Sequence, residues 1–183
     1  MDDLSRKYFD DLHSGDADIR YEAFRYLQKE TQEPVSWAYE VWDELTGMIR
    51  TGNNHERGIG AHLLANLAKS DPEKRMLRDF DLLVRQTHDP KFVTARNTLQ
   101  LFWKVGIIDR EHQDLVTASL LKRYEEAAGD DNITSIRYDI LENLRKIFDQ
   151  FREESIKEKA MELIGRETNL KHQEKFRGLW RRS

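Results

Sequence analysis

Histidine is the residue type in this sequence best suited to metal binding or proton transfer, and six of the 183 residues are histidines. His55 and His62 are seven residues apart, so a helix would place them on one face. No acid or further histidine follows either of them at the three- or four-residue spacing that would complete a set of metal ligands. The sequence therefore predicts neither a metal site nor a cofactor, and we interpret both histidines as solvated or packing side chains.

The segment RGIGAH, residues 57–62, has two of the three glycines of the dinucleotide-binding pattern GxGxxG. Such a loop follows a strand, and no strand pattern precedes this segment. We instead place Gly58 and Gly60 inside a helix over residues 54–68. There a missing side chain lets a neighbouring helix approach closely, at a cost of about 1 kcal/mol relative to alanine.

Nucleophilic or acid–base catalysis needs side chains that converge, and the sequence supplies no such set. No cysteine occurs, and no serine lies between glycines spaced as in a nucleophile elbow. Acid pairs such as Asp71 with Glu73 lie in polar stretches without a nearby base, which is typical of solvated faces. The sequence names no catalytic residue, and we do not expect an enzyme.

The elements that carry these residues are predicted to be helices. All three prolines, Pro34, Pro72 and Pro90, lie in polar breaks, and between the breaks apolar residues recur every three or four positions. No segment alternates in the manner of a strand. We expect about ten helices, over residues 3–13, 18–31, 36–50, 54–68, 74–87, 91–105, 110–127, 134–150, 153–165 and 169–181.

Composition limits what these helices can form. Hydrophobic residues make up 38% of the chain and charged residues 35%, which is typical of a soluble globular protein rather than a disordered one. The acidic start, MDDLSRKYFDDLH, lacks the pattern of a secretory signal, and no apolar run approaches the roughly 18 residues of a membrane span. We therefore expect a cytoplasmic protein with no membrane partner.

Two segments far apart in the chain are nearly the same. Residues 19–29, IRYEAFRYLQK, and residues 136–146, IRYDILENLRK, share Ile, Arg, Tyr, an acid, Leu and Lys at equal offsets. Steps of 37, 37 and 43 residues lead from Arg20 to Arg57, Thr94 and Arg137, and the same register aligns four leucines, Leu27, Leu64, Leu101 and Leu144. This period predicts four stacked helical hairpins over residues 3–31, 36–68, 74–105 and 110–150, capped by helices 153–165 and 169–181.

The segment GDADIRYEAFRYL resembles the HEAT repeat, with an acidic turn, a β-branched residue, an arginine, two variable positions and a small residue. The segments DDNITSIRYDIL and NNHERGIGAHLL are fainter copies. The third unit departs from the pattern, because Thr94 stands in place of the arginine and Asn97 in place of the small residue. The resemblance implies an all-α fold, a right-handed α-solenoid forming a single domain over residues 1–183, with the second helix of each hairpin on a concave, partner-binding face.

One inner helix differs from the others on this face. Its Leu99 and Trp103 occupy positions that are polar in the other inner helices, so either they turn into the core or they form an apolar spot on the concave surface with a polar rim. The candidate partner-binding residues on the concave face are Arg25, Lys29, His62, Asn66, Arg96, Leu99, Trp103, Glu142 and Lys146.

The last fifteen residues form a basic tail. Its five cations and one acid, Glu174, give +4, so the rest of a chain of net charge -4 carries -8. The cations are Lys171, Lys175, Arg177, Arg181 and Arg182. Phe176 and Trp180 would share a helix face, so the tail either caps the stack or docks on an acidic partner or a phosphate backbone.

Two functions remain. We favour a non-enzymatic scaffold or adaptor that binds a protein or peptide on its concave face. The alternative is a nucleic-acid-binding or DNA-repair protein, since some DNA alkylation-repair glycosylases are similar to HEAT solenoids. The inner helices mix signs, as at Arg25, Lys29, Asp139 and Glu142, and such a face would hold a polyanion poorly. Nucleic acid is therefore expected only through the basic tail.

Overall fold

The computed structural model describes residues 1–181, and within them it contains helices and no strand. The α-helices are α1 (Asp3–Asp11), α2 (Ala17–Glu30), α3 (Ala38–Thr51), α4 (Asn54–Leu67), α5 (Arg75–Gln86), α6 (Phe92–Leu99), α7 (Phe102–Gly106), α8 (Arg110–Glu126), α9 (Ile133–Phe151), α10 (Glu154–Gly165) and α11 (Leu170–Trp180). Two 3-10 helices, η1 (Ala68–Ser70) and η2 (Ala127–Gly129), extend α4 and α8. The all-helical prediction is confirmed. No helical segment in this part of the chain combines the length and hydrophobicity that a membrane span requires.

Polar residues in the turns cap the starts of several helices. The Asp16 carboxylate accepts hydrogen bonds from the backbone amides of Asp18 and Ile19. Asn53 and Glu56 form a reciprocal capping box at the start of α4. Asn132 precedes α9 without such a bond, so no side-chain cap begins that helix.

The prediction of one helix over residues 91–105 is wrong, because the helix is interrupted between Leu99 and Phe102. The side chain of Asn143 on α9 occupies the gap. Its Oδ1 accepts a hydrogen bond from the Trp103 backbone amide at 2.7 Å, and its Nδ2 donates to the Leu99 carbonyl at 3.0 Å. In an unbroken helix these two backbone groups would form a hydrogen bond with each other, so the side-chain amide of Asn143 replaces one backbone hydrogen bond of the helix.

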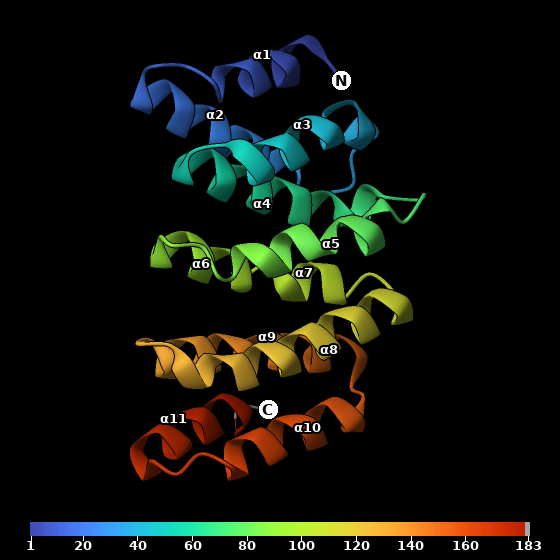
Figure 1. The fold of residues 1–183 in the computed structure, drawn as a ribbon. Helices are drawn as coiled ribbons and strands as arrows, with labels where there is room; N and C mark the ends of the chain where they lie inside the picture. Colours follow the sequence, from blue (N-terminus) through green and yellow to red (C-terminus); the bar gives the residue numbers. More distant parts are fainter. Residues whose placement is uncertain (182–183) are drawn as a thin grey trace. The chain divides into compact units, whose positions relative to one another are not determined.

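The chain divides into two compact units, Met1–Thr98 and Leu99–Ser183, and the boundary falls inside the third predicted hairpin. A single domain over residues 1–183 stays a prediction. In the first unit α1 packs on α2 and α3 packs on α4, while α2 also contacts α4 and α3 contacts α5 (Figure 1). Each hairpin thus covers part of the next, as stacked hairpins must to bury their apolar sides.

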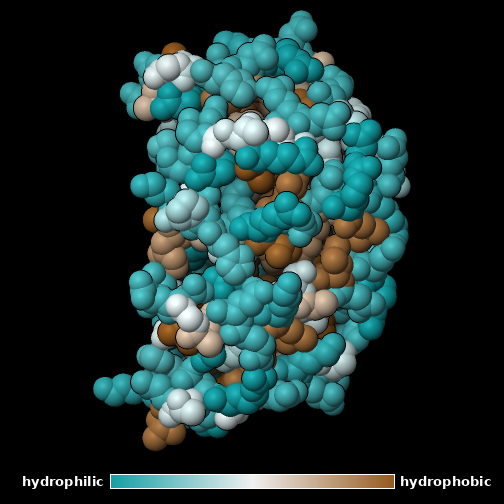
Figure 2. Space-filling view, in the orientation of Figure 1, coloured by the Kyte–Doolittle hydropathy of each residue, from teal (hydrophilic) through white to brown (hydrophobic). Residues whose placement is uncertain are grey.

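The second unit repeats this pattern. The helices α7, α9 and α11 contact one another in sequence, and α8 and α10 pack against α9 (Figure 1). Each of the helices α7 and α9 therefore lies beside the α-helix that comes two later in the chain. Hydrophilic side chains cover most of the molecular face in Figure 2, and hydrophobic ones lie there in small groups.

The four aligned leucines are all buried, as the repeat predicted. Leu27, Leu64 and Leu144 have no exposed surface, and Leu101 is 6% exposed. Gly60 also behaves as expected, because a Cβ atom there would lie 3.0 Å from the Leu45 carbonyl oxygen on α3. The same expectation for Gly58 is wrong, since a Cβ atom at that position would meet nothing within 4 Å.

Candidate functional site

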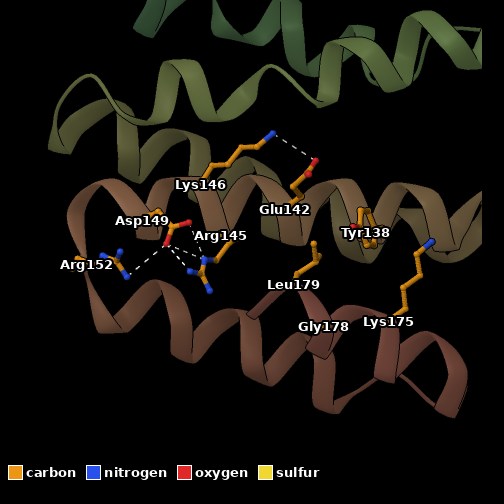
Figure 3. A pocket seen from close by; sticks show the side chains of 9 residues that line it. All are labelled: Tyr138, Glu142, Arg145, Lys146, Asp149, Arg152, Lys175, Gly178 and Leu179. Carbon is orange, nitrogen blue, oxygen red and sulfur yellow. Dashed lines mark hydrogen bonds and ion pairs between the residues drawn. The ribbon is translucent and has the colours of Figure 1, made fainter. Parts of the chain in front are cut away.

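A groove between α9 and α11 is the candidate site of the second unit (Figure 3). Its volume is about 630 Å³, within the roughly 300–1,000 Å³ of most ligand sites. We call it the α9–α11 groove, and its lining residues are Tyr138, Glu142, Arg145, Lys146, Asp149, Arg152, Lys175, Gly178 and Leu179.

Helical periodicity and packing set the shape of this groove. The lining residues of α9 recur at intervals of about one helical turn, so they share a face. The helix α11 is held by Phe176, which is fully buried, and by Trp180, whose ring centroid lies 5.7 Å from that of Phe148. Gly178 lines the groove from α11, and a Cβ atom there would meet nothing within 4 Å. The groove is therefore open above this glycine.

Both carboxylates of the groove are engaged with its own cations. Asp149 lies between two arginines: the Arg145 Nε donates to its two oxygens at 2.9 Å, and the Arg152 guanidinium lies 3.7 Å away (Figure 3). Glu142 lies 3.6 Å from the Lys146 ammonium. Four cations face two carboxylates in the lining, so the groove carries a net charge of +2.

Aromatic rings lie close to all four of these cations. The Lys175 ammonium extends from α11 toward Tyr138 and lies 4.6 Å from the centre of its ring (Figure 3). The Lys146 ammonium lies 5.3 Å from the Trp103 ring, which is half-buried beside the groove. Such pairs combine a charged head with a flat apolar surface, and each element can bind a ligand.

The structure brings some of the predicted partner-binding residues together. Glu142 and Lys146 line the groove, and Lys146 connects it to Trp103. Leu99 does not belong to an exposed surface, because it is 1% exposed and packs into the core. The two residues therefore do not share one environment. Leu99 belongs to the core, whereas Trp103 lies at the border of the core and the surface.

The other predicted residues of the concave face lie in the first unit. Arg25 and Lys29 are exposed on α2, and Arg96 is half-buried on α6. His62 is half-buried, with its Nε2 2.9 Å from the Gln28 amide. Asn66 cannot bind a partner, because its side chain is 1% exposed and donates to the Thr31 hydroxyl at 2.9 Å. Whether the residues of the two units form one concave face stays a prediction.

The basic tail supplies one residue to the groove, Lys175. Lys171, Arg177 and Arg181 are exposed outside its lining, and the two arginines lie 3.9 and 3.2 Å from Glu174. Arg182 lies outside the described residues. Phe176 is buried against α9, as expected for a capping helix.

Sequence reasoning missed six lining residues: Tyr138, Arg145, Asp149, Arg152, Gly178 and Leu179. Tyr138, Arg145 and Asp149 on α9 could have been found by extending the helical face of Glu142 in both directions, whereas Arg152 follows the end of α9 in a left-handed conformation. The two on α11 carry no such signal, because a glycine and a leucine become part of a site only through the packing of α11 on α9.

A smaller hollow of about 320 Å³ lies in the first unit, beside Arg57 and Asp89. These two residues form a bidentate ion pair with distances of 2.6 and 3.1 Å. Burial alone would raise the pKa of Asp89, but hydrogen bonds from Arg57 and the Lys91 amide outweigh it and lower the pKa. The pair joins α4 to the turn after α5 and is therefore structural.

No cluster of three or more possible metal ligands lies within residues 1–181. The chain matches no protein-family model, and no curated protein matches it significantly. Function must therefore be argued from the groove itself. Its side chains offer cations, carboxylates and aromatic faces, which recognise ligands by ion pairing, hydrogen bonding and stacking.

Proposed function

We propose that this chain is a non-enzymatic protein-interaction module, a right-handed HEAT-like α-solenoid of four hairpins and a C-terminal cap. In this proposal it acts as a scaffold or adaptor in the cytoplasm, and the α9–α11 groove holds part of its protein partner. Because every lining residue belongs to the second unit, the binding site does not depend on the arrangement of the two units.

Recurring arginine contacts support the repeat. Arg20 donates to the Ser14 carbonyl and Arg57 to the Gly52 carbonyl, so each binds the turn before its own helix. Arg57 also reaches Asp89 in the following turn, and Arg137 similarly reaches Glu167, 30 residues further along the chain, at 3.2 Å. Equivalent positions thus make equivalent contacts in both units, which favours one repeated structural motif.

One observation supports the binding function above the others. The inner-helix residues Glu142 and Lys146 and the tail residue Lys175, which the sequence marked separately, line one open groove beside Trp103. An aromatic ring within a polar rim is the arrangement that protein partners use as an anchor point. The ion pairs of both carboxylates also make the groove suited to binding, since they stabilise its shape before a partner binds.

Glycine substitutions test this proposal without removing any side chain. Leucine at Gly178 would project into the groove, whereas leucine at Gly58 on α4 also meets open space but lies far from it in the sequence and in the other unit. Both replace a helical glycine, so both should fold. We expect immobilised wild-type protein and Gly58→Leu to capture the same proteins from a native lysate, and Gly178→Leu to lose a subset of them. An identical set from all three would contradict the proposal.

The four cations of the groove favour nucleic-acid binding as the second candidate function. This alternative predicts that a labelled single-stranded oligonucleotide binds at low salt and dissociates steeply as salt rises. We expect no groove-dependent binding in that assay. Oligonucleotide binding that Gly178→Leu abolishes and Gly58→Leu preserves would reverse the order of the two proposals.

A further inference from the structure

We infer that the segment held in the α9–α11 groove is a short acidic peptide, with at least two carboxylates flanking an apolar side chain. This inference rests on the proposed function, because it names the class of partner for the same groove. It follows from the charge of the lining, the placement of its carboxylates and the open space above Gly178.

The charge of the groove sets the sign of the ligand. Its two carboxylates already bind cations of the groove, yet its four cations leave a charge of +2. The Lys175 ammonium rests on the Tyr138 ring and can turn to a ligand without breaking an ion pair within the groove. The Arg152 guanidinium lies 3.7 Å from Asp149, longer than a hydrogen bond, so it too can accept a second anion. Two carboxylates of a ligand would neutralise the site.

The placement of the acids favours peptide carboxylates over a phosphate backbone. Glu142 and Asp149 are seven residues apart on the same face of α9, so they alternate with the cations along the groove. A nucleic-acid strand carries a negative charge at every nucleotide and would meet both acids. A peptide can place neutral or basic residues opposite Glu142 and Asp149 and acidic residues opposite Lys175 and Arg152, which matches charges of both signs.

The apolar part of the ligand has a defined place. Gly178 and Leu179 supply an uncharged wall on α11, and the open space above Gly178 can receive one side chain. The Tyr138 ring lies on the opposite wall, so an aliphatic or aromatic side chain would contact apolar surface on both sides. A volume of about 630 Å³ suits a short segment rather than a folded domain.

Selection of peptides from a random library displayed on phage tests this inference on the full chain. We expect the selected peptides to contain two or more Asp or Glu residues around an apolar residue. These peptides are then synthesised and labelled. We expect them to bind Lys175→Glu at least about tenfold more weakly than wild type, a loss of about 1.4 kcal/mol of binding free energy. The matched control is Lys171→Glu, an exposed lysine on the same helix outside the groove, and it should bind as wild type does.

The outcomes separate this inference from the proposed function. If the selected peptides are neutral or basic and do not bind Gly178→Leu, the ligand is not acidic, and this inference is wrong. The proposed function would still stand, because the groove would still bind peptides. Selected peptides that bind Gly178→Leu and Gly58→Leu equally well would overturn both. An oligonucleotide that displaces the peptides with a steep salt dependence would overturn the inference in favour of a polyanion.

Discussion

At the scale of single residues, Asn143 shows how one side chain can replace a backbone hydrogen bond. It is 2% exposed and forms hydrogen bonds with the Leu99 carbonyl and the Trp103 amide. These two backbone groups do not bond to each other, because the helix is interrupted between them. Nothing in the local sequence of residues 91–105 signals this interruption, because the cause is a side chain more than 35 residues away in the chain. A prediction from local periodicity could not have found it.

We expect Asn143→Ala to lower the free energy of unfolding by about 2–4 kcal/mol, because two buried backbone groups lose their partner. Chemical denaturation followed by circular dichroism measures this change. The matched control is Asn97→Ala, an exposed asparagine on α6, which should change stability by less than about 0.5 kcal/mol. Equal stability of both variants would show that α6 and α7 can close into one helix without Asn143.

A second prediction at the residue scale concerns Glu153, whose lowered pKa makes its contribution to stability depend on pH. Hydrogen bonds from Ser155, Arg110 and Gln113 lower its pKa from 4.5 to about 2. Because the folded-state pKa lies below the unfolded one, the stabilisation is full above about pH 4.5 and is lost as the pH falls toward 2. We expect Glu153→Gln to be less stable than wild type at neutral pH, with a difference that shrinks across this range.

Denaturation of wild type and Glu153→Gln at a series of pH values measures that difference. Glu158→Gln, an exposed glutamate on α10, the helix that follows Glu153, controls for the loss of one negative charge. A difference between wild type and Glu153→Gln that stays constant from neutral pH to pH 2 would rule out the lowered pKa.

At the scale of elements, the close contact of α3 and α4 depends on Gly60. We expect Gly60→Ala to destabilise the protein by about 1–3 kcal/mol, because its Cβ would press on the Leu45 carbonyl of α3. Gly58→Ala on the same helix meets open space and should stabilise it by about 0.5–1 kcal/mol through helix propensity. Thermal unfolding of the two variants compares them, and an equal effect would show that α3 and α4 do not pack this closely.

A second prediction at the element scale concerns the stability that the packing of α11 on α9 contributes. Phe176→Ala should cost about 3–5 kcal/mol, since its ring is fully buried. Leu170→Ala on the same helix should be nearly neutral, because Leu170 is 76% exposed. Chemical denaturation separates the two variants. Equal, small losses from both would mean that α11 does not cap the second unit.

The positions of the helices could be predicted because their signals are local. Pro34, Pro72 and Pro90 mark breaks, and polar residues such as Asp16 and Asn53 precede helix starts, so the expected ranges lie close to the observed helices except at residues 91–105. The groove could be predicted only in part. Glu142 and Lys146 follow from helical periodicity, whereas Gly178 enters the site through tertiary packing that no local pattern encodes.

At the scale of the whole molecule, the repeat is the feature that the sequence expresses most clearly. Leucines at positions 27, 64, 101 and 144 are buried in both units, and Arg57 and Arg137 each bind a carboxylate that follows about 30 residues later. Asn66 was misplaced on a surface, and Leu99 was left open between core and surface, for one reason: the register fixes the spacing of positions, but rotation of each helix about its axis decides which of them face inward. Such rotations depend on the packing of complete side chains.

The central claim is that the α9–α11 groove binds the partner. Hydrogen–deuterium exchange of the full chain, with and without a selected acidic peptide, tests it most directly. We expect peptide to slow exchange in residues 138–152 and 175–180 and to leave α2 and α4 unchanged. Slowed exchange confined to the first unit, with α9 and α11 unaffected, would contradict the account.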